Sequence, residues 1–312
     1  MATMEMPSHV RIVEVGPRDG LQNERTLIPT SVKLELIERL VCAGLREIEV
    51  TAFVSPRWVP QMADHGAVLA GLVPHAGVRH WVLIPNRHGL DAALAAGARH
   101  VAVFPAASET FSQRNLNCSI ATALARCGDV VAAASAAGAS VRGYISCALG
   151  CPYEGNVEAA RVADLADALL AMGCAELSLA DTIGAGTPGT TWRLWDAVLA
   201  RVPPARLAGH FHDTGGMAIA NILASLQVGI TTFDSAVAGL GGCPYAPGAS
   251  GNVATEDLVH LLAGLGIETG VDADLLAQTG DHISRLLGRP SAARSRAHCQ
   301  APAAAAQAPQ AS

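Results

Sequence analysis

Two histidines separated by one residue are the first feature of this chain that indicates chemistry. His210 and His212 end an apolar run, RLAGHFH, that is typical of a β-strand. Side chains two positions apart on a strand point to the same face, so both imidazoles could bind one divalent cation. The alternative is that one of them is a buried structural histidine. Because Asp213 adjoins the pair at a strand end, the metal site is favoured.

A second feature is a single cysteine, Cys243, inside the glycine-rich segment GLGGCPYAPGASGN at 239–252. The glycines and prolines of this segment exclude a helix or strand interior and predict a mobile loop. A thiol in a loop at the end of a strand can act as a nucleophile or as a proton shuttle. The alternative is an inert small residue, but a flexible loop does not need a thiol, so we expect a chemical role.

Charged residues also follow several strand-like runs. Arg18 and Asp19 come directly after the first run, Glu49 lies at the end of the second, and Asp181 follows the sixth. Apolar packing alone does not place charges at these positions. An arginine can bind a carboxylate or polarise a carbonyl oxygen with two parallel hydrogen bonds. The alternative for Arg18 and Asp19 is a structural ion pair.

These residues require a fold that brings the ends of several strands together. Eight short apolar runs alternate with segments of helical periodicity such as 31–44 and 156–173. Eight units of about 30 residues predict an α/β fold, a (β/α)8 TIM barrel, with extra C-terminal helices in 255–288. The strand candidates are 10–15, 46–51, 78–84, 99–104, 141–146, 175–180, 206–212 and 231–237.

An open doubly wound sheet is the alternative architecture. Such sheets carry a glycine-rich phosphate-binding fingerprint after the first strand, whereas this chain has GPRDGLQ there. We therefore predict a single barrel domain over 8–290. Residues 291–312 are rich in Ala, Gln and Pro and predict a low-complexity, disordered tail.

The predicted barrel brings four metal-binding side chains to one end. The active sites of such barrels lie where the strands end, and the first strand neighbours the eighth. Asp19 and Asn252 would then add two oxygens to the nitrogens of His210 and His212. Two nitrogens, two oxygens and open positions suit octahedral Mg²⁺ or Mn²⁺ better than tetrahedral zinc.

Composition excludes several function classes. The chain has 312 residues, half of them hydrophobic, and a net charge of −6 without a basic run, which argues against nucleic-acid binding. No apolar run approaches the roughly 18 residues of a membrane span, and no signal-peptide pattern is visible. The eight cysteines are scattered, which predicts reduced thiols and a cytoplasmic protein. Among those other than Cys243, we expect only Cys299 to be exposed.

The combination of segments resembles the 3-hydroxy-3-methylglutaryl-CoA lyase family, part of a TIM-barrel metallolyase group that also contains isopropylmalate and homocitrate synthases. The resemblance runs from about residue 10 to about 290. The long cysteine segment and RDGLQNE are its most specific parts. The matching segments are VEVGPRDGLQNE, AFVSPRWVPQMADH, NCSI, VRGYISCALGCPYEG, DTIGAGTPG, HFHDT and AGLGGCPYAPGASGNVATEDLVHLL.

The resemblance implies a metal-dependent carbon–carbon lyase that cleaves 3-hydroxy-3-methylglutaryl-CoA to acetyl-CoA and acetoacetate, as in leucine degradation and ketone-body metabolism. The partner is thus an acyl-CoA substrate, and a homodimer is implied. The implied ligands of the cation are Asp19, His210, His212 and Asn252.

The resemblance also implies roles for five further side chains. Arg18 would stabilise the enolate oxygen that develops on the thioester carbonyl, and Cys243 would close over the site and take part in proton transfer. Glu49 and Asp181 would orient metal ligands or relay protons, and Gln22 would contribute a hydrogen bond to the substrate.

Three alternative functions remain at this point. The first is a lyase for a bulkier 3-hydroxy-3-alkylglutaryl-CoA, such as the isohexenyl compound of terpene breakdown, with the same metal site and a larger pocket. The second is an isopropylmalate-synthase-like condensing acyltransferase, which the thiol loop and the absence of room for a regulatory domain disfavour. The third is a non-catalytic metal-binding scaffold, which leaves the loop thiol unexplained.

Overall fold

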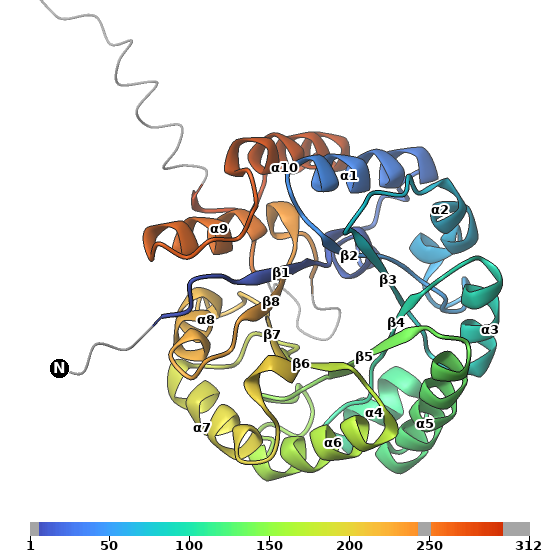
Figure 1. Cartoon of the computed structure of the whole chain (residues 1–312), viewed down its shortest axis with the longest axis vertical. Helices are drawn as coiled ribbons and strands as arrows, with labels where there is room; N and C mark the ends of the chain where they lie inside the picture. The colour runs from blue at the N-terminus through green and yellow to red at the C-terminus, as the bar shows by residue number, and fades with distance from the viewer. Residues whose placement is uncertain (1–5, 243–250, 296–312) are drawn as a thin grey trace, which may run out of the picture.

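The computed structural model describes residues 6–242 and 251–295, and these form a closed barrel of eight parallel strands. Each strand pairs with the next, and β8 pairs with β1, so the barrel has no open edge (Figure 1). The predicted TIM barrel is therefore confirmed. The strands are β1 (Arg11–Glu14), β2 (Glu47–Ala52), β3 (Arg79–Leu83), β4 (His100–Val103), β5 (Ser140–Ile145), β6 (Glu176–Asp181), β7 (Leu207–Phe211) and β8 (Thr232–Ser235).

Helices surround the strands as an outer ring (Figure 1). Two helices, α4 and α5, connect β4 to β5, two helices, α9 and α10, follow β8, and one α-helix follows each of the other strands. The helices are α1 (Thr30–Cys42), α2 (His65–Gly71), α3 (Arg87–Ala95), α4 (Glu109–Leu116), α5 (Ile120–Ala136), α6 (Ala159–Met172), α7 (Pro188–Leu199), α8 (Ala218–Leu226), α9 (Thr255–Gly264) and α10 (Ala273–Leu287).

Both helices predicted after the eighth strand are present. In the ring, α9 takes the place of the eighth barrel helix, between α8 and α10 (Figure 1). The additional helix is α10, which packs beside α1. It therefore covers the seam between the last and the first unit of the barrel.

Helix α6 shows how the sequence pattern produces the outer layer. Its buried side chains recur at helical spacing and form one apolar stripe that faces the barrel: Val162, Ala163, Leu165, Ala166 and Leu169. The helix ends at Gly173, whose φ of 112° is the left-handed conformation that glycine adopts without a steric penalty. The predicted helix end is confirmed.

A network of buried charged side chains crosses the barrel interior. Arg142 on β5 donates hydrogen bonds to Glu176 Oε1 at 2.8 Å, to the Tyr144 hydroxyl at 2.9 Å and, across the barrel, to Asp234 Oδ1 at 2.7 Å. Glu176 also pairs with Arg11. Buried charges are costly unless they are paired and hydrogen-bonded. The interior thus contains a connected ion network.

The described cysteines are free thiols. Our expectation that Cys42 is not exposed was wrong, because this residue, in the last turn of α1, is exposed. Cys299 itself lies outside the described residues.

Among the described helices, none alone is long and apolar enough to span a membrane. The pair α4 and α5, bent by 58° at the break between them, meets the length and apolarity criteria only when the two are taken together.

Candidate metal centre

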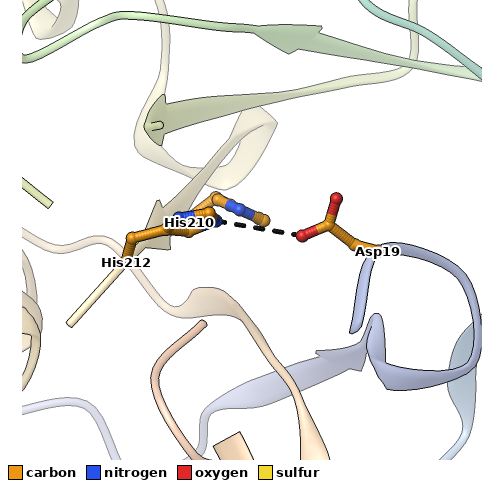
Figure 2. A group of neighbouring side chains, drawn as sticks. All are labelled: Asp19, His210 and His212. Carbon is orange, nitrogen blue, oxygen red and sulfur yellow. Dashed lines mark ion pairs between the residues drawn. The ribbon is translucent and has the colours of Figure 1, made fainter. Parts of the chain in front are cut away.

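Three potential metal ligands meet at the carboxyl end of the barrel. His210 lies in β7 and His212 directly follows that strand, while Asp19 lies in the short turn Gly16–Gly20 after β1. One ligand atom from each residue lies within 4.8 Å of the others. Figure 2 shows the two imidazole rings facing the Asp19 carboxylate, and His212 Nε2 is 3.8 Å from Asp19 Oδ2.

Asn252, the last residue of the glycine-rich segment 239–252, also lies beside these three residues. An isolated backbone bridge pairs Asn252 with His212, which holds the two side by side. Its side-chain nitrogen donates to Asp19 Oδ2 at 2.8 Å and to the Leu240 carbonyl at 3.1 Å. These two acceptors fix the orientation of the amide, so Oδ1 is the free end. That oxygen is buried and has no hydrogen-bond partner among the described residues.

The turn that carries Asp19 is anchored by Glu14 at the end of β1. Glu14 accepts hydrogen bonds from the backbone nitrogens of Gly16 at 2.8 Å and Val237 at 2.9 Å, and from the Thr255 hydroxyl at 2.7 Å. A Cβ at Gly16 would lie 2.5 Å from Glu14 Oε1, so this anchor requires glycine. Burial raises the pKa of Glu14 to about 7, against the lowering effect of these hydrogen bonds.

Arg18 links Asp19 to Glu49. Its Nε donates to Glu49 Oε2 at 2.6 Å, and one terminal nitrogen donates to Asp19 Oδ1 at 2.7 Å. Burial alone would raise the pKa of Asp19, but the Arg18 charge and the two histidines hold it well below its usual range. Asp19 therefore stays ionised, and the ion pair that we considered as the alternative role of Arg18 is present.

Glu49 lies inside β2, not at its end as predicted. Burial raises its pKa, while the neighbouring Arg18 lowers it without cancelling the effect. Its Oε1 is buried and has no hydrogen-bond partner in the described part of the chain. Glu49 thus presents one carboxylate oxygen to Arg18 and keeps the other available.

The outer ring nitrogen of His210 contacts Asp234, a residue that we did not predict as part of the site. Its Nδ1 lies 3.1 Å from Oδ2 of Asp234 on β8, and Ser178 donates to that same oxygen at 2.7 Å. Burial lowers the pKa of His210, but the contact with Asp234 outweighs it and raises the pKa overall. Burial would raise the pKa of Asp234, yet Arg142 and His210 bring it down to about 2. The signal for this residue was a lone carboxylate within the apolar run TTFDSAV.

Asp181 ends β6, and its carboxylate is turned toward the loop that follows. Its two oxygens accept hydrogen bonds from the backbone nitrogens of Ala185 at 3.0 Å and Gly186 at 2.9 Å. Burial raises its pKa despite these bonds. This geometry gives Asp181 a role in shaping the β6–α7 loop beside the histidines.

Two other candidates have no described contact with the centre. Gln22 is half-buried after the Asp19 turn, and no hydrogen bond of its side chain is found within residues 6–242 and 251–295. Cys243 lies outside the described residues, so its predicted closure over the site stays a prediction.

The donor set fits a divalent cation. Metal–ligand bonds of about 2.1 Å place two ligands of one ion at most about 4.2 Å apart, so a small inward shift lets Asp19, His210 and His212 share an ion. Asn252 Oδ1, a buried acceptor without a described donor, would supply a fourth ligand. Mixed nitrogen and oxygen ligands with open positions are typical of octahedral cations that also bind substrate.

The chain is similar to proteins of known sequence and structure over most of its length. A family model described as HMGL-like matches residues 9–283. The chain is 57% identical over 289 residues to the mitochondrial hydroxymethylglutaryl-CoA lyase of Rattus norvegicus, covering 93% of this chain and 89% of the relative. It is 54% identical to the cytoplasmic 3-hydroxy-3-methylglutaryl-CoA lyase of the same animal, covering 91% and 83%. The crystal structure of hydroxymethylglutaryl-CoA lyase from Pseudomonas aeruginosa superimposes with a TM-score of 0.93 at 55% identity, covering 95% and 99%.

Proposed function

The chain belongs to the HMGL-like family, and on that premise we propose that it cleaves 3-hydroxy-3-methylglutaryl-CoA to acetyl-CoA and acetoacetate. The observation that carries the proposal is the meeting of Asp19, His210 and His212 at the mouth of the barrel, with the free oxygen of Asn252 beside them. The lyase names of relatives at 54–57% identity favour cleavage over the condensing reaction of isopropylmalate synthases.

We propose Asp19, His210, His212 and Asn252 as ligands of Mg²⁺ or Mn²⁺. A cation bound by these residues would supply Lewis-acid stabilisation of the negative charge that develops on the substrate oxygens. Two further side chains orient the proposed ligands. Arg18 donates to Oδ1 of Asp19, and Asp234 contacts Nδ1 of His210, so Asp19 Oδ2 and His210 Nε2 remain for the cation.

Cleavage needs a proton acceptor for the hydroxyl and a donor for the carbon of the departing enolate. When the C2–C3 bond breaks, the hydroxyl oxygen becomes the ketone of acetoacetate and the bonding electrons pass into the acetyl-CoA enolate. Glu49 fits the acceptor role, because its Oε1 is buried and without a described partner and burial raises its pKa. Arg18 fits the stabilisation of the enolate oxygen, since its charge is buried beside the ligands.

Three roles in this proposal depend on the sequence resemblance more than on contacts. Cys243 would protonate the enolate carbon from the segment that follows Gly242. Gln22 would donate a hydrogen bond to the substrate. Asp181 would act by holding the β6–α7 loop, which the two backbone hydrogen bonds to its carboxylate support.

We propose a cytoplasmic homodimer. The relatives include both mitochondrial and cytoplasmic proteins, and the reduced thiols of the described residues fit a reducing compartment. Sedimentation equilibrium of the purified chain would give its mass in solution, and a single species of monomer mass would contradict the dimer.

The test of function is acetyl-CoA release from 3-hydroxy-3-methylglutaryl-CoA and from its isohexenyl analogue, with Mg²⁺ and with EDTA. We expect Mg²⁺-dependent release that stops in EDTA, and a higher kcat/KM for the methyl substrate. A higher kcat/KM for the isohexenyl compound would contradict the substrate assignment but not the reaction. No release from either compound by metal-loaded protein would contradict the lyase function.

A further inference from the structure

We infer that Asp234 is a positioning residue that fixes the imidazole of His210 with Nδ1 protonated and Nε2 directed at the cation. The inference rests on the proposed metal centre, which it deepens by assigning a role to a residue that is not itself a ligand. The supporting observation is the set of three side chains that contact the Asp234 carboxylate.

Every contact of the Asp234 carboxylate comes from a donor on another strand. Oδ1 accepts from Arg142 on β5 at 2.7 Å, and Oδ2 accepts from Ser178 on β6 at 2.7 Å and faces His210 Nδ1 on β7 at 3.1 Å. Arg142 and Asp234 are each no more than 1% exposed, so water does not compete for these bonds. An ionised carboxylate only accepts hydrogen bonds, so His210 Nδ1 must carry the proton.

With Nδ1 engaged, Nε2 is the nitrogen of His210 left to bind a cation. Figure 2 places the ring on the side of β7 that faces Asp19. A carboxylate that holds the outer nitrogen of a metal-bound histidine sets its tautomer, its orientation and its basicity. The pair His210–Asp234 has this arrangement.

His212 provides an internal contrast. Its Nδ1 is buried and has no hydrogen-bond partner among the described residues, so no described side chain holds the outer nitrogen of this ring. A described side chain thus holds the outer ring nitrogen of His210 only. The backbone of His212 is placed by its bridge to Asn252. Loss of Asp234 should for that reason change the orientation and tautomer of the His210 ring and leave His212 in place.

The Arg142 network explains why Asp234 stays ionised and in place. Arg142 also donates to Glu176 and to Tyr144, so its guanidinium cannot swing away from the carboxylate. Glu176 shares the same arginine but forms no hydrogen bond or ion pair with either histidine in the described part of the chain, which makes it a matched control. Both carboxylates belong to one buried ion network, and only one of them contacts His210.

The test is Mn²⁺ affinity, measured by electron paramagnetic resonance of the free ion, in wild type, Asp234→Asn, Ser178→Ala and Glu176→Gln. We expect Asp234→Asn to weaken Mn²⁺ binding by about 10–100-fold. Ser178→Ala, which removes a single hydrogen bond to Asp234, should show a smaller loss in the same direction. Glu176→Gln should lose stability to urea while keeping the wild-type Mn²⁺ affinity.

A second readout reports the tautomer directly. In ¹H–¹⁵N spectra of histidine-labelled, Mg²⁺-loaded protein, His210 should show a protonated Nδ1, with its signals assigned by their loss in His210→Asn. An unprotonated Nδ1 in wild type, or equal Mn²⁺ affinity in wild type, Asp234→Asn and Ser178→Ala, would overturn the inference and leave the metal centre intact. Failure of wild type to bind Mn²⁺ would overturn the proposed metal centre as well.

Discussion

The side-chain nitrogen of Asn252 lies 2.8 Å from Asp19 Oδ2, although the two residues are 233 positions apart in the chain. The contact turns Asn252 Oδ1 away from Asp19, and that oxygen is buried and unpaired among the described residues. A buried acceptor without a donor is costly unless a ligand satisfies it. The pair thus joins the segments that follow the first and last strands of the barrel around a position suited to a cation.

Replacement of Asn252 by alanine should weaken cation binding, because it removes the free oxygen and the hydrogen bond that steadies Asp19. The measurement is the Mn²⁺ dissociation constant, which should rise in Asn252→Ala. Asn86→Ala is the control: Asn86 caps α3 by accepting from the Gly89 nitrogen at 3.0 Å, so its loss should cost about 1 kcal/mol of stability without changing Mn²⁺ affinity. Equal Mn²⁺ affinity of Asn252→Ala and wild type would show that Asn252 is not a ligand.

Removal of the Arg18 charge should slow the chemical step more than it weakens substrate binding. Arg18 is 6% exposed and lies where enolate charge develops in the proposed reaction. Loss of one such preorganised donor costs about 10²–10³-fold in kcat. We expect a fall of this size in Arg18→Gln, measured by steady-state acetyl-CoA release.

The matched control for that experiment is Arg87→Gln, since Arg87 is exposed and its side chain pairs with Asp91 on the same helix. It should turn over at the wild-type rate. If Arg18→Gln kept the wild-type kcat and changed only KM, Arg18 would be a binding residue and not a stabiliser of the transition state.

Cation removal should lower the stability of the folded protein. A ligand at 100 times its dissociation constant stabilises the state that binds it by about 2.7 kcal/mol. We expect EDTA to lower the melting temperature of wild type, and Mg²⁺ to restore it. In Asp19→Asn the melting temperature should not respond to either addition, and a full Mg²⁺ response in this variant would place the bound ion elsewhere.

The buried carboxylate of Glu256 should make stability depend on pH. Burial raises its pKa to about 8, although its oxygens accept from the Ala238 nitrogen. Between about pH 4.3, where the unfolded chain releases this proton, and about pH 8, the folded protein retains it. The stabilisation from that proton is complete below this window and is lost as the pH rises through the folded pKa.

Glu256→Gln keeps the shape of the neutral acid and removes the titration. Its unfolding free energy should fall less than that of wild type between about pH 6 and pH 9, by roughly 1–3 kcal/mol. The exposed Glu158→Gln is the control and should follow the wild-type curve. Parallel curves for Glu256→Gln and wild type from urea titrations would contradict the raised pKa.

The fold could be predicted because its signals are local. Each unit repeats an apolar run and an amphipathic helix, and Gly173 shows how a single residue type marks a helix end. The separation of two in HxH likewise directs the side chains of His210, in β7, and His212, directly after it, to the same face whatever lies around them. Asp19 and Asn252 could be added because strand order brings the first and eighth strands together.

The side chains that orient the proposed ligands could not be predicted, because their positions depend on contacts across the barrel. Asp234 and Arg142 are 92 positions apart and meet only when β5 and β8 face each other through the interior. A carboxylate in an apolar run gives no indication of which arginine will pair with it. Asp181 lies at the end of the sixth strand as predicted, but its hydrogen bonds to the Ala185 and Gly186 nitrogens depend on the path of the following loop, which the sequence pattern does not define.

The most direct test of the account is the rate at which metal-loaded wild type and Asp19→Asn form acetoacetate and acetyl-CoA from 3-hydroxy-3-methylglutaryl-CoA. We expect wild type to form the two products in equal amounts. Since a catalytic cation contributes several kcal/mol, Asp19→Asn should lose at least about a hundredfold in kcat. Absence of both products with wild type, or equal turnover by Asp19→Asn, would contradict a cleavage that depends on a cation held by Asp19, His210 and His212.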